Sequence, residues 1–309
     1  LTQGLVSEFR ALIRIIGART LLAHSLRWGD EAALAEAGGQ EGVERVLISH
    51  GSHTRPDKRS IMEIIRTHAR GLLVSPLADM TIVQSPHAEE LAKELDPNLK
   101  RIRSRPVMWG YKHLPLRDRG VDRRRILHAG TFKPHWGPRT FMYEMSDEFV
   151  DGIAKLIKAV SEMPDTELVV RVRPAAECSV SSLEALLPKV DNCIMRCDGA
   201  FLDDLAQSDL LVSYSSTTIE ESIHARRPVL LWGGAQRYRH IAARVSPPTA
   251  GDRNAVYAVD NDNDLPPMLD AILDVHSGVP LDDGEIRPHV WFDIPSAEQQ
   301  LFDCLKDRA

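Results

Sequence analysis

The sequence predicts an α/β protein in which parallel sheets are doubly wound, with helices on both faces. Three observations predict this class. From about residue 124 onward short apolar runs alternate with segments of helical periodicity, and the connections between them are short. The runs are also apolar almost throughout, as strands buried on both faces of a sheet are.

The elements of the second half follow in order along the chain. The first expected strand, 126–131, is an apolar run that ends at a glycine turn. The helix after it, 148–163, has Phe149, Ile153 and Ile157 on one face. Further strands are expected at 167–174, 193–196, 209–214, 228–232 and 256–259, and further helices at 182–190, 201–207, 217–226 and 236–244.

The first half repeats the pattern less completely. Strands are expected only at 46–49 and 80–84, and helices at 5–26, 61–68 and 86–95. We therefore expect a truncated first α/β domain. The predicted division is an N-terminal domain over 1–110, a linker over 111–123, a second domain over 124–275, and a tail over 276–309 with an amphipathic helix from Trp291 through Cys304.

Composition and charge exclude several classes of protein. The 309 residues are 43% hydrophobic and 27% charged, with a net charge of −6, so we expect no attraction to nucleic acid. No apolar run reaches the ~18 residues of a membrane helix. Four scattered cysteines make no disulfide framework, and the pair Cys193 and Cys197 lacks the second pair of a zinc site. Reduced thiols predict a cytoplasmic protein.

Polar residues at the ends of the expected strands are the candidates for chemistry, because ligands of open α/β sheets bind beyond the carboxyl ends of the strands. His50, in the run Ser49-His50-Gly51-Ser52-His53, has the side chain best suited to accept a proton near neutral pH. A loop with two solvated histidines is the alternative.

Two further strand ends suggest anion binding. Gly130 and Thr131, with Lys133 close by, present N–H and O–H groups that suit a phosphate. Arg173 is the second arginine of Arg171-Val172-Arg173 and would hold a phosphate through two hydrogen bonds. A buried salt bridge is the alternative account of the arginines.

The most specific pattern is the hydroxyl-rich loop before the helix at 217–226. Ser215, Ser216 and Thr217 lead into a helix start that suits an anion, and Glu220 follows one turn later. A capping box formed with Glu220 or Glu221 explains one hydroxyl and leaves the rest unexplained. Gly233-Gly234 after the next strand allows either a close approach to a ligand or a tight turn.

These residues resemble the nucleotide-binding domain of GT-B glycosyltransferases, a fold of two Rossmann-like domains. The loop from Ser215 to Glu221, followed by Pro228-Val229, is similar to segments of non-hydrolysing UDP-N-acetylglucosamine 2-epimerases and of CDP-glycerol glycerophosphotransferases. The segment Arg171-Val172-Arg173-Pro174 is similar to the Arg-x-His-Pro strand end of glycerophosphotransferases and capsule-type transferases, with Arg173 in place of the histidine. The resemblance covers residues 45–60 and 124–235.

The resemblance implies a role for each residue. His50 would be the acceptor base of a His-Gly motif on the acceptor-side domain. Ser215, Ser216, Thr217 and Arg173 would hold the donor diphosphate, together with Gly130 and Thr131, and Glu220 would hold the ribose. No metal or other cofactor is implied, since the fold stabilises the departing nucleotide without one.

We therefore expect a nucleotide-sugar-dependent transferase that passes a sugar or a polyol phosphate to a glycan or lipid-linked acceptor of surface polysaccharide. A peripheral position at the inner membrane stays open. Two rivals also remain, an epimerase of the UDP-N-acetylglucosamine 2-epimerase type and a non-catalytic fragment that binds nucleotide sugars. Among the acids of the first half, Asp57, Glu63 and Asp79 are those an epimerase could use.

Overall fold

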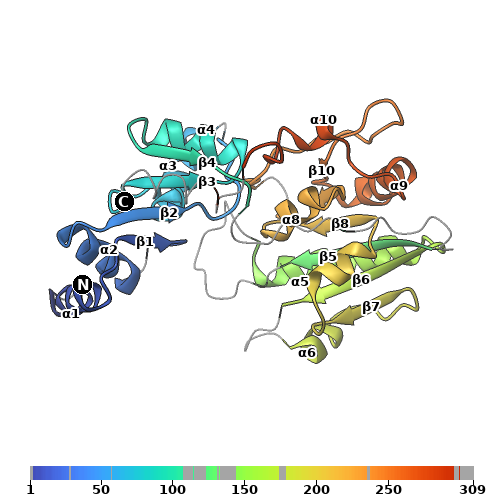
Figure 1. Ribbon diagram of the computed structural model, residues 1–309. Coiled ribbons are helices and arrows are strands. Elements are labelled where there is room, and N and C mark those ends of the chain that lie inside the picture. The colour runs from blue at the N-terminus through green and yellow to red at the C-terminus, as the bar shows by residue number, and fades with distance from the viewer. Residues whose placement is uncertain are drawn as a thin grey trace. The chain divides into compact units, whose positions relative to one another are not determined.

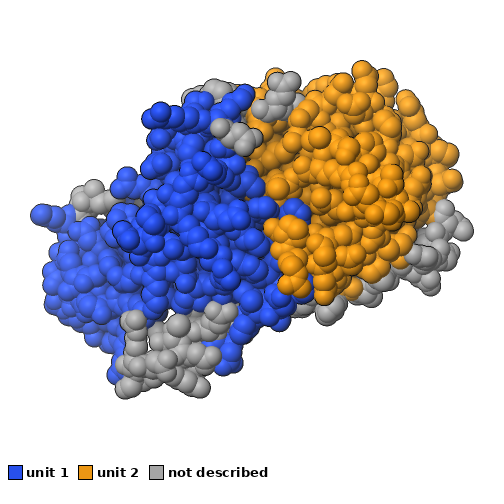
Figure 2. Space-filling view, turned by 90° about the horizontal axis from the view of Figure 1, so that it is seen from above, with its two compact units in different colours: residues 1–110, 289–309 blue, residues 111–288 orange. Residues whose placement is uncertain are grey.

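The computed structural model describes residues 3–27, 29–56, 58–106, 114, 123–130, 132, 144–173, 179–234, 237–295 and 299. It divides into two compact units, which Figure 2 colours separately. Unit 1 comprises Leu1–Gly110 and His289–Ala309, and unit 2 comprises Tyr111–Pro288. The predicted tail over 276–309 is therefore divided between the units, and nearly all of the predicted linker lies outside the described residues.

Unit 1 is built on a parallel sheet in the order β1-β2-β3-β4, with helices before and between the strands (Figure 1). Its strands are β1 (Thr20–Ala23), β2 (Glu44–Ile48), β3 (Met80–Val83) and β4 (Lys100–Arg103). Its helices are α1 (Gln3–Ile16), α2 (Gly29–Gln40), α3 (Arg59–Ala69) and α4 (Pro86–Leu95). The sequence predicted β2 and β3 and missed β1 and β4.

The predicted helix over 5–26 is too long, because the chain turns in its middle. Gly17 has a φ of 63°, the left-handed conformation that commonly ends a helix, and β1 begins three residues later. α2 was missed for a different reason: it is rich in alanine and glycine, and its buried residues do not form one apolar stripe.

Unit 2 is built on a six-stranded parallel sheet in the order β10-β9-β8-β5-β6-β7. Its strands are β5 (Arg124–Gly130), β6 (Thr166–Val172), β7 (Cys193–Arg196), β8 (Leu210–Ser213), β9 (Val229–Leu231) and β10 (Val256–Ala258). The chain runs outward from β5 to β7, returns to β8 beside β5, and then runs outward the other way. This is the strand order of a Rossmann fold.

The helices of unit 2 connect these strands, and an apolar core forms against the sheet. They are α5 (Ser146–Ser161), α6 (Val180–Glu184), α7 (Phe201–Ala206), α8 (Thr218–His224), α9 (Leu265–His276) and α10 (Asp283–Ile286). Phe149, Ile153 and Ile157 of α5 are buried in the core, as their spacing predicts. All six predicted strands are present.

Three further helix predictions differ from the structure. The helix predicted over 182–190 is much shorter, since α6 ends at Glu184. Residues 237–244 are not helical, because this segment is held by other contacts: Arg237 pairs with Glu148, and the backbone N–H of Arg244 donates to the carbonyl of Val256. The predicted C-terminal helix is absent from 291–295, and its remainder, apart from Gln299, lies outside the described residues. No helix of the described residues is both long enough and apolar enough to cross a bilayer.

Candidate functional site

The carboxyl edge of the unit 2 sheet contains the point at which the strand order reverses, between β5 and β8. In open α/β sheets the loops after the two strands at such a point lead to opposite sides of the sheet, and ligands bind in the crevice between them. Ser213, the last residue of β8, donates a hydrogen bond of 2.6 Å to the carbonyl of Ala129 on β5. The two strand ends are therefore tied together directly below this crevice.

The hydroxyl-rich loop begins at this edge. Ser215, Ser216 and Thr217 are partly exposed and lie between β8 and the first turn of α8. Thr217 occupies the N-cap position, but its side chain makes no capping hydrogen bond. The hydroxyl of Ser216 accepts a weak bond of 3.4 Å from the Thr218 N–H. The capping box considered from the sequence is therefore not formed.

Two adjacent carboxylates follow in the first turn of α8. Glu220 is 7% exposed, and a carboxylate that is this deeply buried is normally hydrogen-bonded or paired. Burial, with the charge of Glu220 beside it, raises the pKa of Glu221 to about 7. The first turn of α8 thus presents one buried and one half-buried carboxylate close to the switch point.

Gly130 lies at the end of β5 and is required by packing. A Cβ at this position would come within 2.7 Å of the Phe149 ring and 3.0 Å of the His128 ring. Burial lowers the pKa of His128 to about 4, so its ring is neutral at pH 7. Thr131 and Lys133, which were predicted to join Gly130 at a phosphate, lie outside the described residues.

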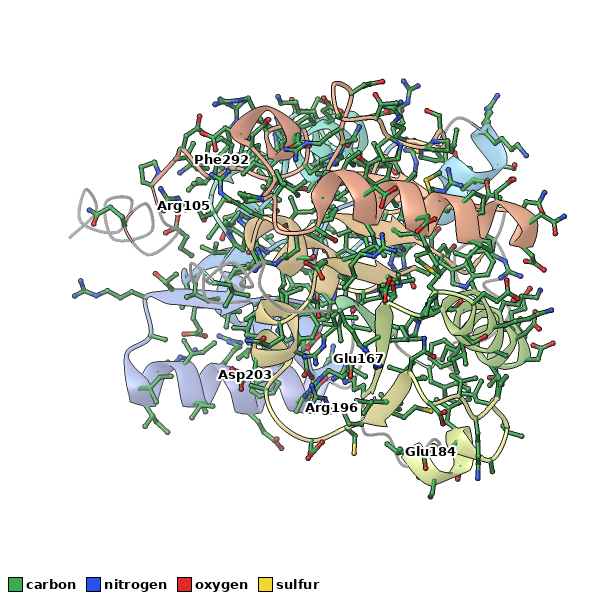
Figure 3. All side chains as sticks on the ribbon, turned by 90° about the vertical axis from the view of Figure 1, so that its right-hand side faces the viewer. Arg105, Glu167, Glu184, Arg196, Asp203 and Phe292 are labelled. Carbon is green, nitrogen blue, oxygen red and sulfur yellow. The ribbon has the colours of Figure 1, made fainter. Side chains whose placement is uncertain are left out.

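The two arginines of β6 have different roles. Arg171 contacts the buried Asp204 at 2.5 Å, and Arg196 of β7 contacts the same carboxylate, so the buried salt bridge considered from the sequence belongs to Arg171 (Figure 3 labels Arg196). Asp204 is 5% exposed and is the shared counter-ion of these two arginines. Arg173 lies just beyond the strand end and is exposed.

The strand order places these segments on neighbouring strands. β8, β5 and β6 are consecutive in the sheet, and adjacent strands are about 4.8 Å apart. The hydroxyl loop, Gly130 and Arg173 therefore leave the same edge at three successive strand ends.

The paired glycines after β9 form a tight turn against an aromatic ring. Gly233 and Gly234 have φ values of 110° and 55°, and a Cβ on Gly234 would overlap the ring of Tyr214. The Tyr214 hydroxyl in turn donates to the carbonyl of Tyr238 at 3.0 Å. Packing within unit 2 accounts for these glycines, in agreement with the tight-turn alternative.

His50 lies at the carboxyl end of β2 in unit 1 and is exposed. Its backbone N–H donates to the carbonyl of Leu72 at 3.0 Å, which holds the loop in place. Desolvation by the atoms around its ring, followed by the charges of His24 and Arg27, lowers its pKa. A neutral imidazole at this position is able to accept a proton at pH 7.

His53 differs from the solvated side chain that the sequence suggested. It is 2% exposed, with its ring centroid 5.7 Å from that of His68. Burial lowers its pKa to about 4. His53 is therefore part of the structure beneath the loop, while His50 lies on its surface.

A buried polar network supports the His50 loop, and the sequence did not reveal it. The Ser52 hydroxyl donates to that of Ser85 at 2.9 Å, and Ser85 caps α4 by accepting from the Ala88 N–H. The Ser49 hydroxyl accepts from the backbone N–H of Gln84. These bonds join the ends of β2 and β3.

Two of the three acids that an epimerase could use, Asp79 and Glu63, do not belong to the His50 loop. Asp79 binds the backbone and guanidinium of Arg45 at the beginning of β2, and Glu63 is exposed on α3 beside Arg66. Asp57 lies outside the described residues. Among the described residues no group of histidine, cysteine and acidic side chains could hold a metal ion.

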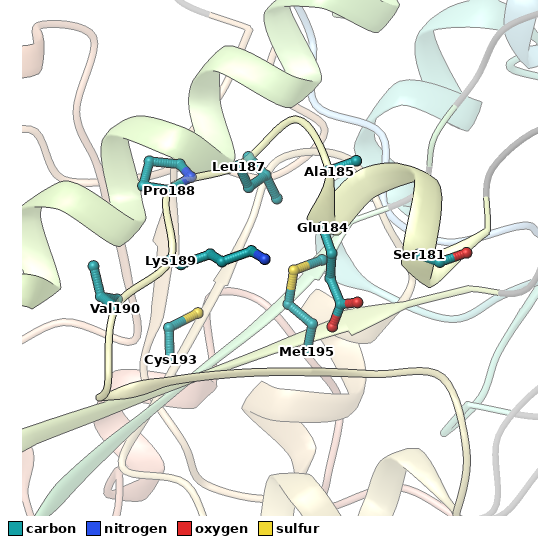
Figure 4. A pocket seen from close by; sticks show the side chains of 9 residues that line it. All are labelled: Ser181, Glu184, Ala185, Leu187, Pro188, Lys189, Val190, Cys193 and Met195. Atoms are coloured by element: carbon teal, nitrogen blue, oxygen red, sulfur yellow. The ribbon is translucent and has the colours of Figure 1, made fainter.

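A pocket of about 410 Å³ lies between α6 and β7, away from the predicted site (Figure 4). Lys189, Glu184 and Met195 are among the residues that line it. Its Cys193 thiol has a pKa raised to about 11 by burial, so it is unreactive near neutral pH. None of the residues predicted from the sequence for the functional site lines this pocket.

No protein-family model matches the chain, and no curated protein sequence matches it. Solved structures, in contrast, do match the chain. The Staphylococcus aureus MnaA–UDP co-structure has a TM-score of 0.63 and 11% identity, covering 100% of this chain and 79% of its own. A Neisseria meningitidis UDP-GlcNAc 2-epimerase bound to UDP-GlcNAc has a TM-score of 0.62 and 10% identity, and the match covers 98% of this chain and 80% of the epimerase chain.

A synthase structure matches the chain to a similar extent. Sucrose-phosphate synthase from Thermosynechococcus elongatus has a TM-score of 0.56 and 13% identity, covering 98% of this chain and 78% of its own. The two parallel sheets and the strand order of unit 2 agree with these likenesses. The chain therefore has the fold of these structures, two Rossmann-like domains of the GT-B type, as the sequence predicted.

Proposed function

We propose that the chain is a nucleotide-sugar-dependent transferase, which moves a sugar or a polyol phosphate from an activated nucleotide to an acceptor hydroxyl. One observation carries this proposal: the hydroxyl loop and buried Glu220 lie where the strand order of unit 2 reverses. The solved structures of the same fold that contain UDP or UDP-GlcNAc support the choice of a nucleotide-sugar donor.

The donor is proposed to bind along the carboxyl edge of unit 2. Ser215, Ser216 and Thr217 donate hydrogen bonds to the diphosphate, and Arg173 contributes a charged bond from the neighbouring strand end. Glu220 accepts bonds from the ribose hydroxyls. Charge on the departing nucleotide is stabilised by these groups in place of a metal ion, so donor binding should persist in EDTA.

His50 is proposed to act as the general base. Its imidazole accepts the proton of the acceptor hydroxyl as the acceptor oxygen bonds to the transferred group and the bond from that group to the nucleotide breaks. The lowered pKa of His50 keeps it in the neutral, proton-accepting form at pH 7.

An epimerase is the second candidate, because the solved structures with TM-scores of 0.63 and 0.62 include a UDP-GlcNAc 2-epimerase. An epimerase must remove and replace a proton on the sugar, and carboxylates near the base would assist that step. The described strand-end loops of unit 1, residues 24–27, 49–56, 84–85 and 104–106, contain none, and Asp57, which follows the His50 loop, lies outside the described residues.

The test is a thermal-shift screen with UDP, CDP, CMP and GDP and the corresponding linked donors. A nucleotide that binds only the folded protein stabilises it by about 2.7 kcal/mol at 100 times its Kd. We expect a pyrimidine nucleotide to raise the melting temperature and Glu220→Gln to diminish that rise. Glu221→Gln is the matched control, about 100° around the same helix. Absence of any nucleotide effect on the intact chain contradicts the proposal.

A further inference from the structure

Helix α1 of unit 1 carries a stripe of exposed apolar side chains. One side of the helix is covered, since Val6 and Ile13 are buried in a cluster with residues of α2 (Figure 1). Leu12, Ile15 and Ile16 are instead 47%, 81% and 63% exposed, and no other described helix or strand exposes three large apolar side chains. A contiguous apolar surface of this kind marks an interaction site.

The stripe has the residue spacing of helices that pair with one another. Leu5, Glu8, Leu12 and Ile15 follow each other at alternating intervals of three and four residues. This interval places side chains along one seam between two packed helices. The seam on α1 therefore has an exposed apolar centre, with an exposed acid one turn before it.

A basic residue follows the carboxyl end of the stripe. Arg19 lies three residues past the end of α1, and its carbonyl accepts from the Glu44 N–H at 3.1 Å, so β2 fixes its position. The side chains of Glu8 and Arg19 are both exposed, and neither makes a hydrogen bond or an ion pair with another described residue. An acid before the apolar centre and a base after it make this surface complementary to a second copy of itself.

The order of these residues selects an antiparallel arrangement of the two copies. The point midway between Leu12 and Ile15 is also midway between Glu8 and Arg19 in the sequence. A two-fold axis through that point places Leu12 of one copy against Ile15 of the other, and Glu8 of one copy near Arg19 of the other. A parallel pair would place each charge beside its like.

We propose that α1 binds α1 of a second copy of this chain in antiparallel orientation, forming a two-fold symmetric dimer through unit 1. Leu12, Ile15 and Ile16 are buried at the centre of the contact, and an ion pair between Glu8 and Arg19 closes each end. Both ion pairs follow from the symmetry, because a two-fold contact repeats each of its interactions. The inference concerns the assembly of the chain and does not depend on the proposed function.

A bilayer surface is a poorer occupant of the stripe. An interfacial helix buries its apolar face at the boundary of headgroups and acyl chains, and its basic side chains attract anionic lipids. Glu8 lies on the apolar stripe of α1, so its carboxylate would have to enter that boundary. The two basic residues of the helix, Arg10 and Arg14, are both bound to Glu41 at 2.6 Å. The charges of α1 therefore fit a second copy better than an anionic membrane.

The test is sedimentation velocity of the intact chain over a wide range of concentrations. We expect a species of twice the 34.5 kDa chain mass, whose fraction rises with concentration. Ile15→Lys should raise the dimer Kd by about 30-fold or more, because it places a charge at the centre of the contact. Leu186→Lys, which replaces a leucine of unit 2 that is 67% exposed, is the matched control and should leave the Kd unchanged.

Two outcomes of this experiment overturn the inference. One is a chain that stays monomeric at every concentration. The other is an equal change of the Kd in Ile15→Lys and Leu186→Lys. Far-UV circular dichroism spectra that match that of the unaltered chain show that the variants are folded, as expected for exposed positions.

An exchange of charges tests the antiparallel orientation. Glu8→Lys and Arg19→Glu should each raise the dimer Kd about 10-fold, because two like-charged contacts replace two ion pairs. The variant with both substitutions again places opposite charges against each other, and its Kd should return to within about 3-fold of that of the unaltered chain. A double variant that is as weak as the single ones overturns the pairing of Glu8 with Arg19.

Flotation with phosphatidylglycerol vesicles separates a bilayer from a second copy. The unaltered chain should not float with the vesicles, and neither should Ile15→Lys. Flotation of the unaltered chain that Ile15→Lys abolishes would assign the stripe to a membrane surface and overturn the dimer.

Discussion

In both units the candidate residues follow the carboxyl ends of parallel strands, but the residue types differ: they are basic in unit 1, and hydroxyls with a carboxylate in unit 2. The carboxyl edge of unit 1 carries His24, Arg27 and His50 over a buried serine network. The corresponding edge of unit 2 carries serine and threonine hydroxyls before α8, with the buried Glu220 one turn later. Both edges follow from parallel βα units, so the fold alone does not determine which chemistry each performs.

This difference is the reason why the proposed function assigns nucleotide binding to unit 2 and proton transfer to unit 1. Unit 2 contains the reversal of strand order, and its hydroxyls and carboxylate suit a nucleotide's phosphates and ribose. The described strands of unit 1 run in simple order without a reversal, and that edge offers a neutral histidine and arginines. This comparison predicts that substitutions in one unit leave the other unit's function intact.

The largest expected effect is on turnover. His50→Ala should lower the transfer rate by about 10²- to 10⁴-fold, the usual contribution of a general base, and should leave nucleotide affinity nearly unchanged. Single-turnover kinetics and UDP titration measure the two quantities. Lys58→Ala, exposed just before α3, is the control and should keep the normal rate. A rate for His50→Ala within a few-fold of normal places the base elsewhere.

The second-largest expected effect is on the stability of unit 2, when a buried charge is removed. Asp204→Asn removes the partner of both Arg171 and Arg196 and should destabilise unit 2 by about 3–5 kcal/mol, because two cations then lack their counter-ion. Urea denaturation measures the change. The neighbouring Asp203 is exposed, and Asp203→Asn should alter the free energy of unfolding by no more than about 0.5 kcal/mol. Equal effects in both variants are inconsistent with this role.

Arg173, one residue past the end of β6, is the contrast to Arg171. Arg173→Ala should leave the free energy of unfolding almost unchanged, because the side chain is exposed, and should weaken nucleotide binding by about 10- to 100-fold. Arg123, exposed at the amino end of β5, is the matched control, and Arg123→Ala should not alter binding. Unfolding of the Arg173 variant would assign it a structural role instead.

The smallest effect per residue concerns pH and should appear in both units. Burial lowers the pKa of His53 in unit 1 and of His128 and His276 in unit 2 from 6.5 to about 4. The unfolded chain therefore binds protons first, so stability is complete above pH 6.5 and falls as the pH drops toward 4. Each histidine contributes at most about 1.4 kcal/mol per pH unit.

Denaturation at pH 7.5 and pH 5.5 measures this dependence. His128→Phe should reduce it for unit 2 and leave that of unit 1 unchanged. A free energy of unfolding that does not change between these two pH values would show that the histidines are not buried in neutral form.

Much of unit 2 could be predicted from the sequence because short local residue patterns mark its strands and its longest helix. All six of its strands are apolar runs, and α5 has a clear apolar face. The site residues there follow strand ends, which made Ser215, Glu220 and Arg173 visible as candidates. The sequence did not distinguish Arg171 from Arg173, since the pairing of Arg171 depends on Asp204, far along the chain.

Unit 1 was harder to predict because the residue patterns that mark its elements are short or adjoin an amphipathic helix. β1 has four residues and directly follows the amphipathic α1, so it was absorbed into one long helix together with His24. Gly17 was the available signal for the boundary. The burial of His53 depends on packing against α3, which no local pattern reveals.

The most direct test of the central claim maps the nucleotide onto the two edges. Hydrogen–deuterium exchange measured with and without UDP should show protection in residues 213–221 and at 128–130, and none in residues 46–54. Glu220→Gln should reduce that protection at a fixed UDP concentration. Protection of 46–54 in place of 213–221, or no protection at either edge, would contradict the assignment of the donor to unit 2.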